Sequence, residues 1–254
     1  QRLSRGLGDV YKRQKLKTLE KMREDFIGNV SHELRTPISV IKANSETLLS
    51  TKLIKDENAI NFTKAIQSQS ERMATIVNEL LSISSMESGD YPISLDKLNI
   101  KNIVDSAIKE LNPMTESSNI KLVNKISDIT HIIGDESAIK IIISNYITNA
   151  IKHSPDDEII EIDNEKIDKD FCRIKVIDNG IGIAKKYRER VFERFFRVDK
   201  GRSKKIGGTG LGLSISKNLA LMMGYSVGVE SNEPKGSIFY IDVKIHQETS
   251  KEVA

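Results

Sequence analysis

Residues 26–37 read FIGNVSHELRTP, and they belong to a longer run whose apolar spacing predicts the first half of the fold. Between Lys15 and Ser50, steps of three and four residues connect Ile27, Val30, Leu34, Ile41 and Leu48, with Pro37 and Asn44 in the intervening places. This heptad spacing is typical of a helix that buries one face. His32 lies five residues after Ile27, so we expect it on the outer face of that helix, open to solvent.

A second apolar series keeps the same spacing further along the chain. It runs through Ala59, Phe62, Ile66, Gln69, Met73, Ile76, Leu80 and Ile83, and Val77 and Leu81 widen its stripe. A connection near residues 51–56 then joins two helices into an antiparallel hairpin. One hairpin cannot bury so wide a stripe, so we expect two copies to pair into a four-helix bundle, which makes the protein a homodimer. The alternative is that the hairpin packs against the rest of its own chain.

The pattern changes at Gly89-Asp90-Tyr91-Pro92, which breaks the helix and predicts a domain boundary. Beyond it, helices are expected near residues 100–116, 136–153 and 211–223, and strands near 120–126, 159, 171–178, 227 and 238–245. The fold class is therefore α plus α/β, with a helical layer on a mixed sheet in the second domain. We divide the chain into 1–14, interpreted as non-native sequence, a hairpin at 15–89, an α/β domain at 90–247 and a tail at 248–254.

Composition and charge exclude several classes of function. The chain has 39 basic and 36 acidic residues, a balance that argues against a binder of nucleic acid or of a membrane surface. Cys172 is the only cysteine, which rules out an internal disulfide. No stretch approaches the roughly 20 apolar residues of a membrane helix or has the apolar core of a signal peptide. We therefore expect this fragment to be soluble and to work in a reducing compartment.

Polar side chains recur along one face of the helix expected at 136–153. Asn145, Asn149 and Lys152 follow one another at steps of four and three, so they lie on the same side. An amide oxygen suits Mg²⁺, which prefers oxygen ligands and keeps its waters, and an ammonium group neutralises a triphosphate. The pattern thus favours a Mg²⁺–ATP site, while a solvated polar stripe on an ordinary helix is the alternative.

A carboxylate and two glycines follow the strand expected at 171–178. Asp178 can accept a hydrogen bond from the amino group of adenine, and Gly180 and Gly182 leave room for the base against the backbone. A dinucleotide-binding fingerprint requires a third glycine at the start of a helix. Ala184 and Lys185 come next instead, which argues against that fold.

Five stretches, in this order, resemble the conserved boxes of sensor histidine kinases. They are residues 26–37 for the phospho-acceptor box, 145–154 for the asparagine box, 176–183 for the first glycine box, 190–199 for the phenylalanine box and 207–213 for the second glycine box. The resemblance covers about residues 20–246. It implies a dimerising histidine-phosphotransfer hairpin followed by an α/β sandwich of the gyrase, Hsp90 and MutL (GHKL or Bergerat) type of ATP-binding domain.

The resemblance assigns roles to three residues of the hairpin. It implies that His32 accepts the γ-phosphoryl group of ATP, that Glu33 acts as base or orients the ring, and that Thr36 supports dephosphorylation of the partner. One helical turn separates Thr36 from His32, a spacing that suits the positioning of an attacking water. Alternatively, Ser31 and Thr36 only set a local bend together with Pro37.

The resemblance also implies the nucleotide ligands, with Asn149 assigned to the metal and Lys152 to phosphate. The full set is Asn145, Asn149, Lys152, His153, Asp178, Gly180, Gly182, Ile183, Arg197, Gly208, Thr209, Gly210, Leu211 and Gly212. ATP and Mg²⁺ are the expected cofactors. The phenylalanine and second glycine boxes are expected to frame a lid. The basic residues between Lys200 and Lys205 suit a polyphosphate, and the alternative is a solvated charged loop.

The function implied is an autokinase that phosphorylates His32 and passes the phosphoryl group to an aspartate of a response regulator. We expect the fragment to be the cytoplasmic part of a membrane-anchored sensor whose membrane segments lie outside this chain. One rival is a hydrolytic ATPase of the gyrase class, but such relatives carry a glutamate four residues before the metal-binding asparagine, where this chain has Asn145. A second rival is a scaffold that docks a regulator without transferring phosphate.

Overall fold

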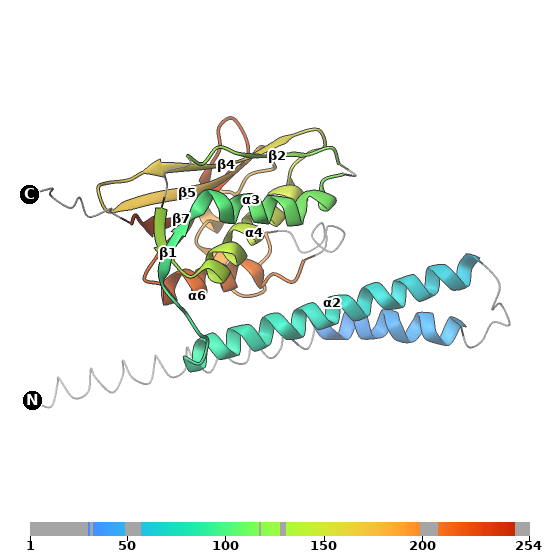
Figure 1. The fold of residues 1–254 in the computed structure, drawn as a ribbon. Coiled ribbons are helices and arrows are strands. Elements are labelled where there is room, and N and C mark those ends of the chain that lie inside the picture. Colours follow the sequence, from blue (N-terminus) through green and yellow to red (C-terminus); the bar gives the residue numbers. More distant parts are fainter. Residues whose placement is uncertain are drawn as a thin grey trace, which may run out of the picture. The chain divides into compact units, whose positions relative to one another are not determined.

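The computed structural model describes residues 30, 33–48, 57–116, 118–127, 131–198 and 208–246 (Figure 1). The chain divides into two compact units, Gln1–Leu80 and Leu81–Ala254, and each is considered by itself. Several predictions lie outside the described residues: the interpretation of residues 1–14, the exposure of His32, the basic stretch from Lys200 to Lys205 and the tail at 248–254. None of the described helices has the length and apolar character that a membrane span requires.

The first unit contains the predicted helical hairpin. A helix covers residues 33–48, and α2 runs from Glu57 to Ser88, past the end of this unit. Glu33 and Arg72 form an ion pair across the two helices, and each lies 16 residues from the nearer end of the 49–56 connection, as an antiparallel pairing requires. Ile76 is fully buried, and Pro37 is buried where the heptad pattern places it. The seam predicted from the apolar spacing is therefore the face that packs.

The second unit is the α/β domain. Its helices are α3 (Ile100–Leu111), α4 (Glu136–His153) and α6 (Gly212–Met222), and its 3-10 turns are η1 (Asn112–Met114), η2 (Lys185–Tyr187) and η3 (Arg190–Phe192). Its strands are β1 (Asp96–Asn99), β2 (Lys121–Asn124), β3 (His131–Gly134), β4 (Ile159–Lys166), β5 (Phe171–Asp178), β6 (Ser226–Ser231) and β7 (Ser237–Lys244). Figure 1 shows α3, α4 and α6 along one side of the sheet.

The main sheet has five strands in the order β2-β4-β5-β7-β6. β2 and β4 are parallel and the other neighbours are antiparallel, so the sheet is mixed, as expected. Along β5, Cys172, Ile174, Val176 and Asp178 are buried while the residues between them are not. This alternation of period two directs the apolar side chains into the core. The same alternation places Asp178 at the buried end of the strand.

One helix and two short strands differ from the sequence-based expectations. The helix expected to reach residue 116 ends at Leu111 and gives way to η1, because Pro113 has no backbone N–H to continue the α-helical ladder. β1 and β3 were not predicted as strands at all. They form a two-stranded antiparallel ladder, with one further isolated bridge from Ile132 to Ile245, and each is four residues long, too short for a periodic signal.

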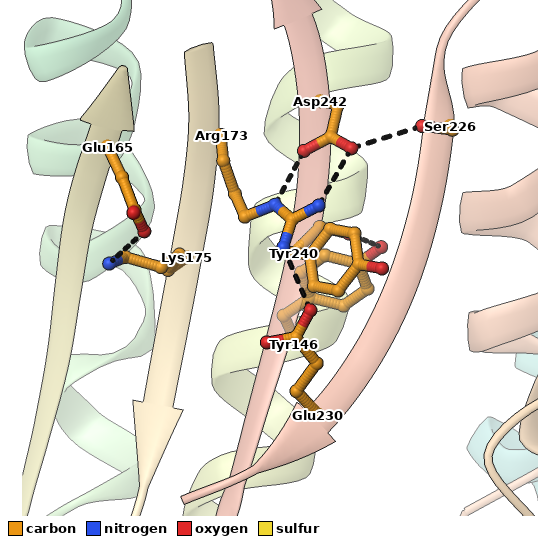
Figure 2. Close-up of polar contacts among 8 residues, drawn as sticks. All are labelled: Tyr146, Glu165, Arg173, Lys175, Ser226, Glu230, Tyr240 and Asp242. Atoms are coloured by element: carbon orange, nitrogen blue, oxygen red, sulfur yellow. Dashed lines mark hydrogen bonds and ion pairs between the residues drawn. The ribbon is translucent and has the colours of Figure 1, made fainter. Parts of the chain in front are cut away.

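Two of the other residues of β5, Arg173 and Lys175, carry charges that are paired with neighbouring strands (Figure 2). Arg173 Nε donates to Asp242 Oδ1 at 2.7 Å and its Nη1 donates to Glu230 Oε1 at 2.9 Å. The same guanidinium lies 3.6 Å from the centroid of the Tyr240 ring. Two residues further along β5, Lys175 Nζ donates to Glu165 Oε2 at 3.0 Å. The two pairs differ in exposure, since Asp242 is 19% exposed and Glu165 is 62% exposed.

This difference predicts unequal effects on stability. Arg173→Met is expected to lower the free energy of unfolding by about 1–3 kcal/mol, because Asp242 keeps its charge without its partner. Lys175→Met is the matched control, with an expected loss of about 0–1 kcal/mol, because water replaces the ammonium at Glu165. Urea unfolding followed by circular dichroism measures both. Equal losses in the two variants contradict the prediction.

Candidate functional site

The asparagine face of α4 is formed as predicted, but one of its residues is already engaged in packing. Asn145, Asn149 and Lys152 are all half-buried on this helix. Asn145 Nδ2 donates to the carbonyl of Gly212 at 3.0 Å and to Ser216 Oγ at 3.1 Å. The amide group of Asn145 thus joins α4 to the first turn of α6. Its predicted contact with nucleotide remains a prediction, and its nitrogen has a structural function.

Asp178 provides a buried carboxylate at the end of β5. It is 3% exposed, and its Oδ1 accepts hydrogen bonds from the backbone N–H groups of Gly180 at 2.8 Å and Ser237 at 3.1 Å. Burial raises the pKa of Asp178, and the two backbone donors partly oppose that effect. A carboxylate held in this way is oriented by the backbone on one oxygen, which suits recognition of a donor by the other.

The glycines after Asp178 bring the backbone into contacts that exclude a side chain. A Cβ atom on Gly180 would lie 2.5 Å from the carbonyl oxygen of His153, at the end of α4. Gly182 has a φ of +71°, and a Cβ atom there would lie 3.1 Å from the carbonyl oxygen of Gly236. The close approach at Gly180 and the positive φ at Gly182 therefore both require glycine. They bring this loop against α4 and against the turn that precedes β7.

Two cationic side chains meet at Gly208. Lys152 Nζ and Arg197 Nη2 each lie 3.9 Å from the point that a Cβ atom on Gly208 would occupy. Arg197 Nη2 is buried and has no hydrogen-bonding partner among the residues that the structure describes. A buried guanidinium nitrogen without a partner is costly, and an anionic oxygen would satisfy it. This arrangement fits the phosphate groups of a nucleotide.

The residues that lead into α6 are ordered by contacts with one another and with the phenylalanine box. Thr209 Oγ1 accepts from the backbone N–H of Leu211 at 3.2 Å. Gly210 has a φ of +76°, and its carbonyl accepts from the backbone N–H of Phe195 at 2.8 Å. Gly212 begins α6, whose first turn has no side-chain cap. Backbone N–H groups at the start of a helix suit an anion, so those of α6 are candidates for contacts with phosphate.

Two further predicted residues lie beside this site. The surrounding protein partly desolvates the His153 ring although this residue is exposed, and this desolvation, followed by the nearby charge of Lys152, lowers the pKa of His153. The lowered pKa favours the neutral imidazole at pH 7. The carbonyl of Ile183 accepts from Arg188 Nε at 3.3 Å, so its backbone connects the glycine loop to the segment that follows η2.

In the hairpin, Glu33 has a partner that the sequence did not predict. Arg72 Nη2 on α2 donates to Glu33 Oε2 at 3.2 Å, and both side chains are mostly buried. Thr36 is exposed, one turn further along the same helix. The residue that precedes Glu33, His32, lies outside the described residues. An exposed threonine therefore stands one turn away from the predicted acceptor position.

The sequence-based analysis missed the residues that support Asp178 from the last hairpin of the sheet. Ser237 donates its backbone N–H to the Asp178 carboxylate, and a Cβ atom on Gly236 would lie 2.0 Å from the Asp178 carbonyl oxygen. The only available signal was the pair Gly236-Ser237 at the start of the last apolar strand. Such a pair reads as an ordinary turn when the strand order is unknown.

The fold and the site together define a nucleotide-binding domain preceded by a helical hairpin. The family model described as "Histidine kinase-, DNA gyrase B-, and HSP90-like ATPase" matches residues 134–247, a range that contains every predicted nucleotide ligand from Asn145 to Gly212. The model described as "His Kinase A (phospho-acceptor) domain" matches residues 22–89, which contain His32. The two matches lie in the order expected from the sequence boxes.

Comparison with individual proteins agrees with both matches. The sensor-like histidine kinase SenX3 of Mycolicibacterium smegmatis is 35% identical over 89% of this chain and 58% of its own length. The structure of full-length ShkA in complex with AMPPNP has a TM-score of 0.66 at 26% identity and covers 86% of this chain and 45% of that one. The histidine kinase ThkA, solved with the response regulator TrrA, shares the fold, with a TM-score of 0.69 at 21% identity over 91% of this chain and 66% of that one.

These findings establish the family. The chain belongs to the sensor histidine kinases and contains both domains of their catalytic core, the phospho-acceptor domain and the ATPase domain. It spans about half the length of the curated relatives that it matches.

Proposed function

We propose that this chain is an ATP-dependent autokinase that phosphorylates His32 and transfers the phosphoryl group to an aspartate of a response regulator. The observation that carries the proposal is Arg197 Nη2, which is buried beside Lys152 at Gly208 and has no hydrogen-bonding partner within the described part of the chain. The two cationic side chains form a candidate site for anionic oxygens in the ATPase domain. The other domain of the chain is of the phospho-acceptor type.

ATP would bind across the second unit with its base and its phosphates at separate groups of residues. The Asp178 carboxylate, which the backbone N–H of Gly180 helps to orient, accepts a hydrogen bond from the 6-amino group of adenine. Lys152 and Arg197 neutralise the phosphate oxygens, together with the backbone donors at the start of α6. Binding at both ends orients the γ-phosphoryl group toward an acceptor.

Asn149 is the residue that would hold Mg²⁺, through its amide oxygen. The donor set fits this ion, because Mg²⁺ takes oxygen ligands, keeps several waters and shares substrate phosphates rather than occupying an all-protein cage. Among the described residues, no group of three acidic, histidine or cysteine side chains offers a competing cage. When bound, Mg²⁺ neutralises negative charge on the β- and γ-phosphates.

His32 then acts as the nucleophile. One nitrogen of its ring attacks the γ-phosphorus in line with the bond to the β-phosphate oxygen, so that a P–N bond forms, the P–O bond breaks and ADP leaves. Glu33, the next residue, orients the ring or takes its proton. In the second step, an aspartate of the regulator attacks the same phosphorus and histidine is the leaving group.

Dimerisation is supported by apolar side chains that the hairpin leaves exposed. Ile60, Val77 and Leu81 on α2 are 57%, 43% and 63% exposed, and Ile38 on the facing helix is 49% exposed. Ile60 and Leu81 are three heptads apart, and Val77 stands four residues before Leu81. A row of this kind is covered when two hairpins pair into a four-helix bundle. We infer that the active form is this homodimer.

The proposal extends to dephosphorylation of the regulator, for which Thr36 is the candidate residue. Thr36 is exposed and follows His32 by four residues in the sequence, a spacing that suits the positioning of a water against an acyl phosphate. Thr36→Ala is expected to slow dephosphorylation of a phosphorylated receiver domain about 10- to 100-fold while self-phosphorylation changes less than about 2-fold. A receiver domain chosen for its ability to take the phosphoryl group from this chain allows both rates to be measured.

Thr47→Ala is the matched control for this variant. Thr47 is also exposed on the helix at 33–48, and its Oγ1 donates to the carbonyl of Ala43 at 2.8 Å. Similar losses in the two variants indicate an effect of threonine on the helix rather than a role in positioning water.

Incubation of the chain with Mg²⁺ and ATP labelled at the γ-phosphate tests the proposed function. Label that is lost in acid and survives alkali identifies a phosphohistidine. Release of ADP without labelled protein favours the hydrolytic ATPase, and ATP binding with neither product favours the scaffold. We further propose that the parent protein is a membrane-anchored sensor of which this chain is the cytoplasmic part, as the sensor kinases among its relatives suggest.

A further inference from the structure

A polar side chain from the β6–β7 turn holds the end of β5 at the candidate adenine site. Asn232, the first residue after β6, donates from Nδ2 to the backbone carbonyl of Asp178 at 2.9 Å and to Asn179 Oδ1 at 3.1 Å. A few residues later, Ser237 donates its N–H to the carboxylate of Asp178. Asp178 is therefore held at its backbone and at its side chain by two ends of the same turn.

The chain of hydrogen bonds continues to a charged residue. Asn179 Nδ2 donates to Glu158 Oε2 at 2.9 Å, and Glu158 lies in the connection between α4 and β4. An ionised carboxylate only accepts hydrogen bonds, so Glu158 requires Asn179 to present its nitrogen. The oxygen of Asn179 then faces Asn232, which must in turn present its own nitrogen. The Glu158 carboxylate thus sets the orientation of both amides, so that Asn232 Nδ2 is the donor at the Asp178 carbonyl.

Close backbone contacts make this position sensitive to small shifts. Gly236 has a φ of +119°, and a Cβ atom on it would lie 2.0 Å from the carbonyl oxygen of Asp178. Asn232 also donates its backbone N–H to the carbonyl of Gly236 at 3.2 Å, which closes the turn. The turn, the strand end and the glycine loop are in direct contact, so a displacement of the turn moves the carboxylate. Displacements of about 1 Å at a recognition group are enough to weaken its selectivity.

We propose that Asn232 is a positioning residue that sets the adenine selectivity of this site. It acts through Asp178 and does not itself touch the nucleotide, and Asn179 and Glu158 keep its amide in the required orientation. The inference rests on the proposed binding of ATP with adenine at Asp178. It adds the β6–β7 turn to the residues that distinguish a 6-amino purine from a purine with an oxygen at that position.

Calorimetric binding of ATP and of inosine triphosphate to the full chain tests this proposal, because the two nucleotides differ at the 6-position and share their phosphates. For Asn232→Ala, we expect ATP affinity to fall about 10-fold and inosine triphosphate affinity less than about 2-fold. Asn232→Asp keeps the size of the side chain but removes both donors, and we expect at least the same loss. The ratio of the two affinities is the decisive quantity, because a general loss of structure lowers both alike.

Asn124→Ala is the matched control. Asn124 Nδ2 also makes two hydrogen bonds in this domain, to the Lys101 carbonyl at 3.3 Å and to Asp105 Oδ1 at 2.7 Å, but on the edge strand β2. Its ratio of affinities should equal that of the parent chain. An unchanged ratio in both Asn232 variants, or equal losses for the two nucleotides, overturns the proposal. A parent chain that binds neither nucleotide contradicts the proposed function instead, so the two failures are distinguishable.

Discussion

Replacing His32 by glutamine is expected to abolish self-phosphorylation, with a loss of labelled protein of about 1,000-fold or more, because the variant lacks the nucleophile. Glutamine is a good helix former and similar in length, so the hairpin should be retained. ATP affinity should stay within about 2-fold, because every nucleotide ligand proposed above lies in the other unit. Filter binding after incubation with labelled ATP measures the first quantity, and calorimetry measures the second.

A complementary variant makes this experiment more specific. Asn149→Ala is expected to lose self-phosphorylation through loss of the Mg²⁺ ligand while its His32 remains intact. When the two variants are mixed and allowed to exchange subunits, label on the Asn149→Ala chain shows that chains pair and that one phosphorylates the other. Absence of label in a mixture shown to exchange indicates that each chain phosphorylates itself. Persistent label in His32→Gln alone contradicts the assignment of the acceptor.

Asp178→Asn should separate nucleotide recognition from stability. ATP affinity is expected to fall about 100-fold, because the amide would direct a donor at the amino group of adenine in place of a charged acceptor. The two backbone bonds to Oδ1 can be kept by the amide oxygen, so the strand end should stay in place. Inosine triphosphate, which has no 6-amino group, should lose little affinity and serves as the internal control.

Asp178→Asn is expected to lower ATP affinity but not to lower the free energy of unfolding at neutral pH. Burial raises the pKa of Asp178 in the folded protein above its value in the unfolded chain. The Asp178 carboxyl group therefore contributes fully to stability at pH values below its pKa in the unfolded chain. This contribution is lost as the pH rises through its pKa in the folded protein. The neutral amide avoids this loss, so the variant should be at least as stable as the parent chain at pH 7. That advantage should disappear below about pH 4, the ordinary range of an aspartate. Urea unfolding at both pH values measures it, and a variant that is less stable at pH 7 contradicts the reasoning.

Several elements follow from local periodicity alone. The residues of α2 that are buried or half-buried include the predicted series from Ala59 to Ile83, because a heptad pattern specifies which face of a helix packs whatever it packs against. α4 has the predicted bounds, and Asp135 caps its first turn by accepting from the N–H of Ala138. β5 also has its predicted bounds, since its alternation is strong. The short strands β1 and β3 carry no such signal.

Spacing along the chain likewise determined which chemistry is available, but not which groups meet. The steps from Asn145 to Lys152 place three polar residues on one side of α4, a property of the helix itself. The Asn145 nitrogen donates hydrogen bonds to α6, and these bonds depend on how two helices far apart in the sequence pack together. Asn145 therefore has a role in packing that its local sequence pattern does not indicate.

The sequence by itself indicated the family, the division into two domains and the positions of the candidate acceptor and nucleotide ligands, because each rests on local sequence. The apolar spacing gave the hairpin, and the resemblance of five short boxes gave the family and the ligands. Only the tertiary structure decided that Arg72 meets Glu33 across the hairpin and that Asn232 and Ser237 hold Asp178. These pairs are separated by 39 to 59 residues. Contacts of that kind arise from strand order and helix pairing, which bring together residues whose local sequences contain no information about each other.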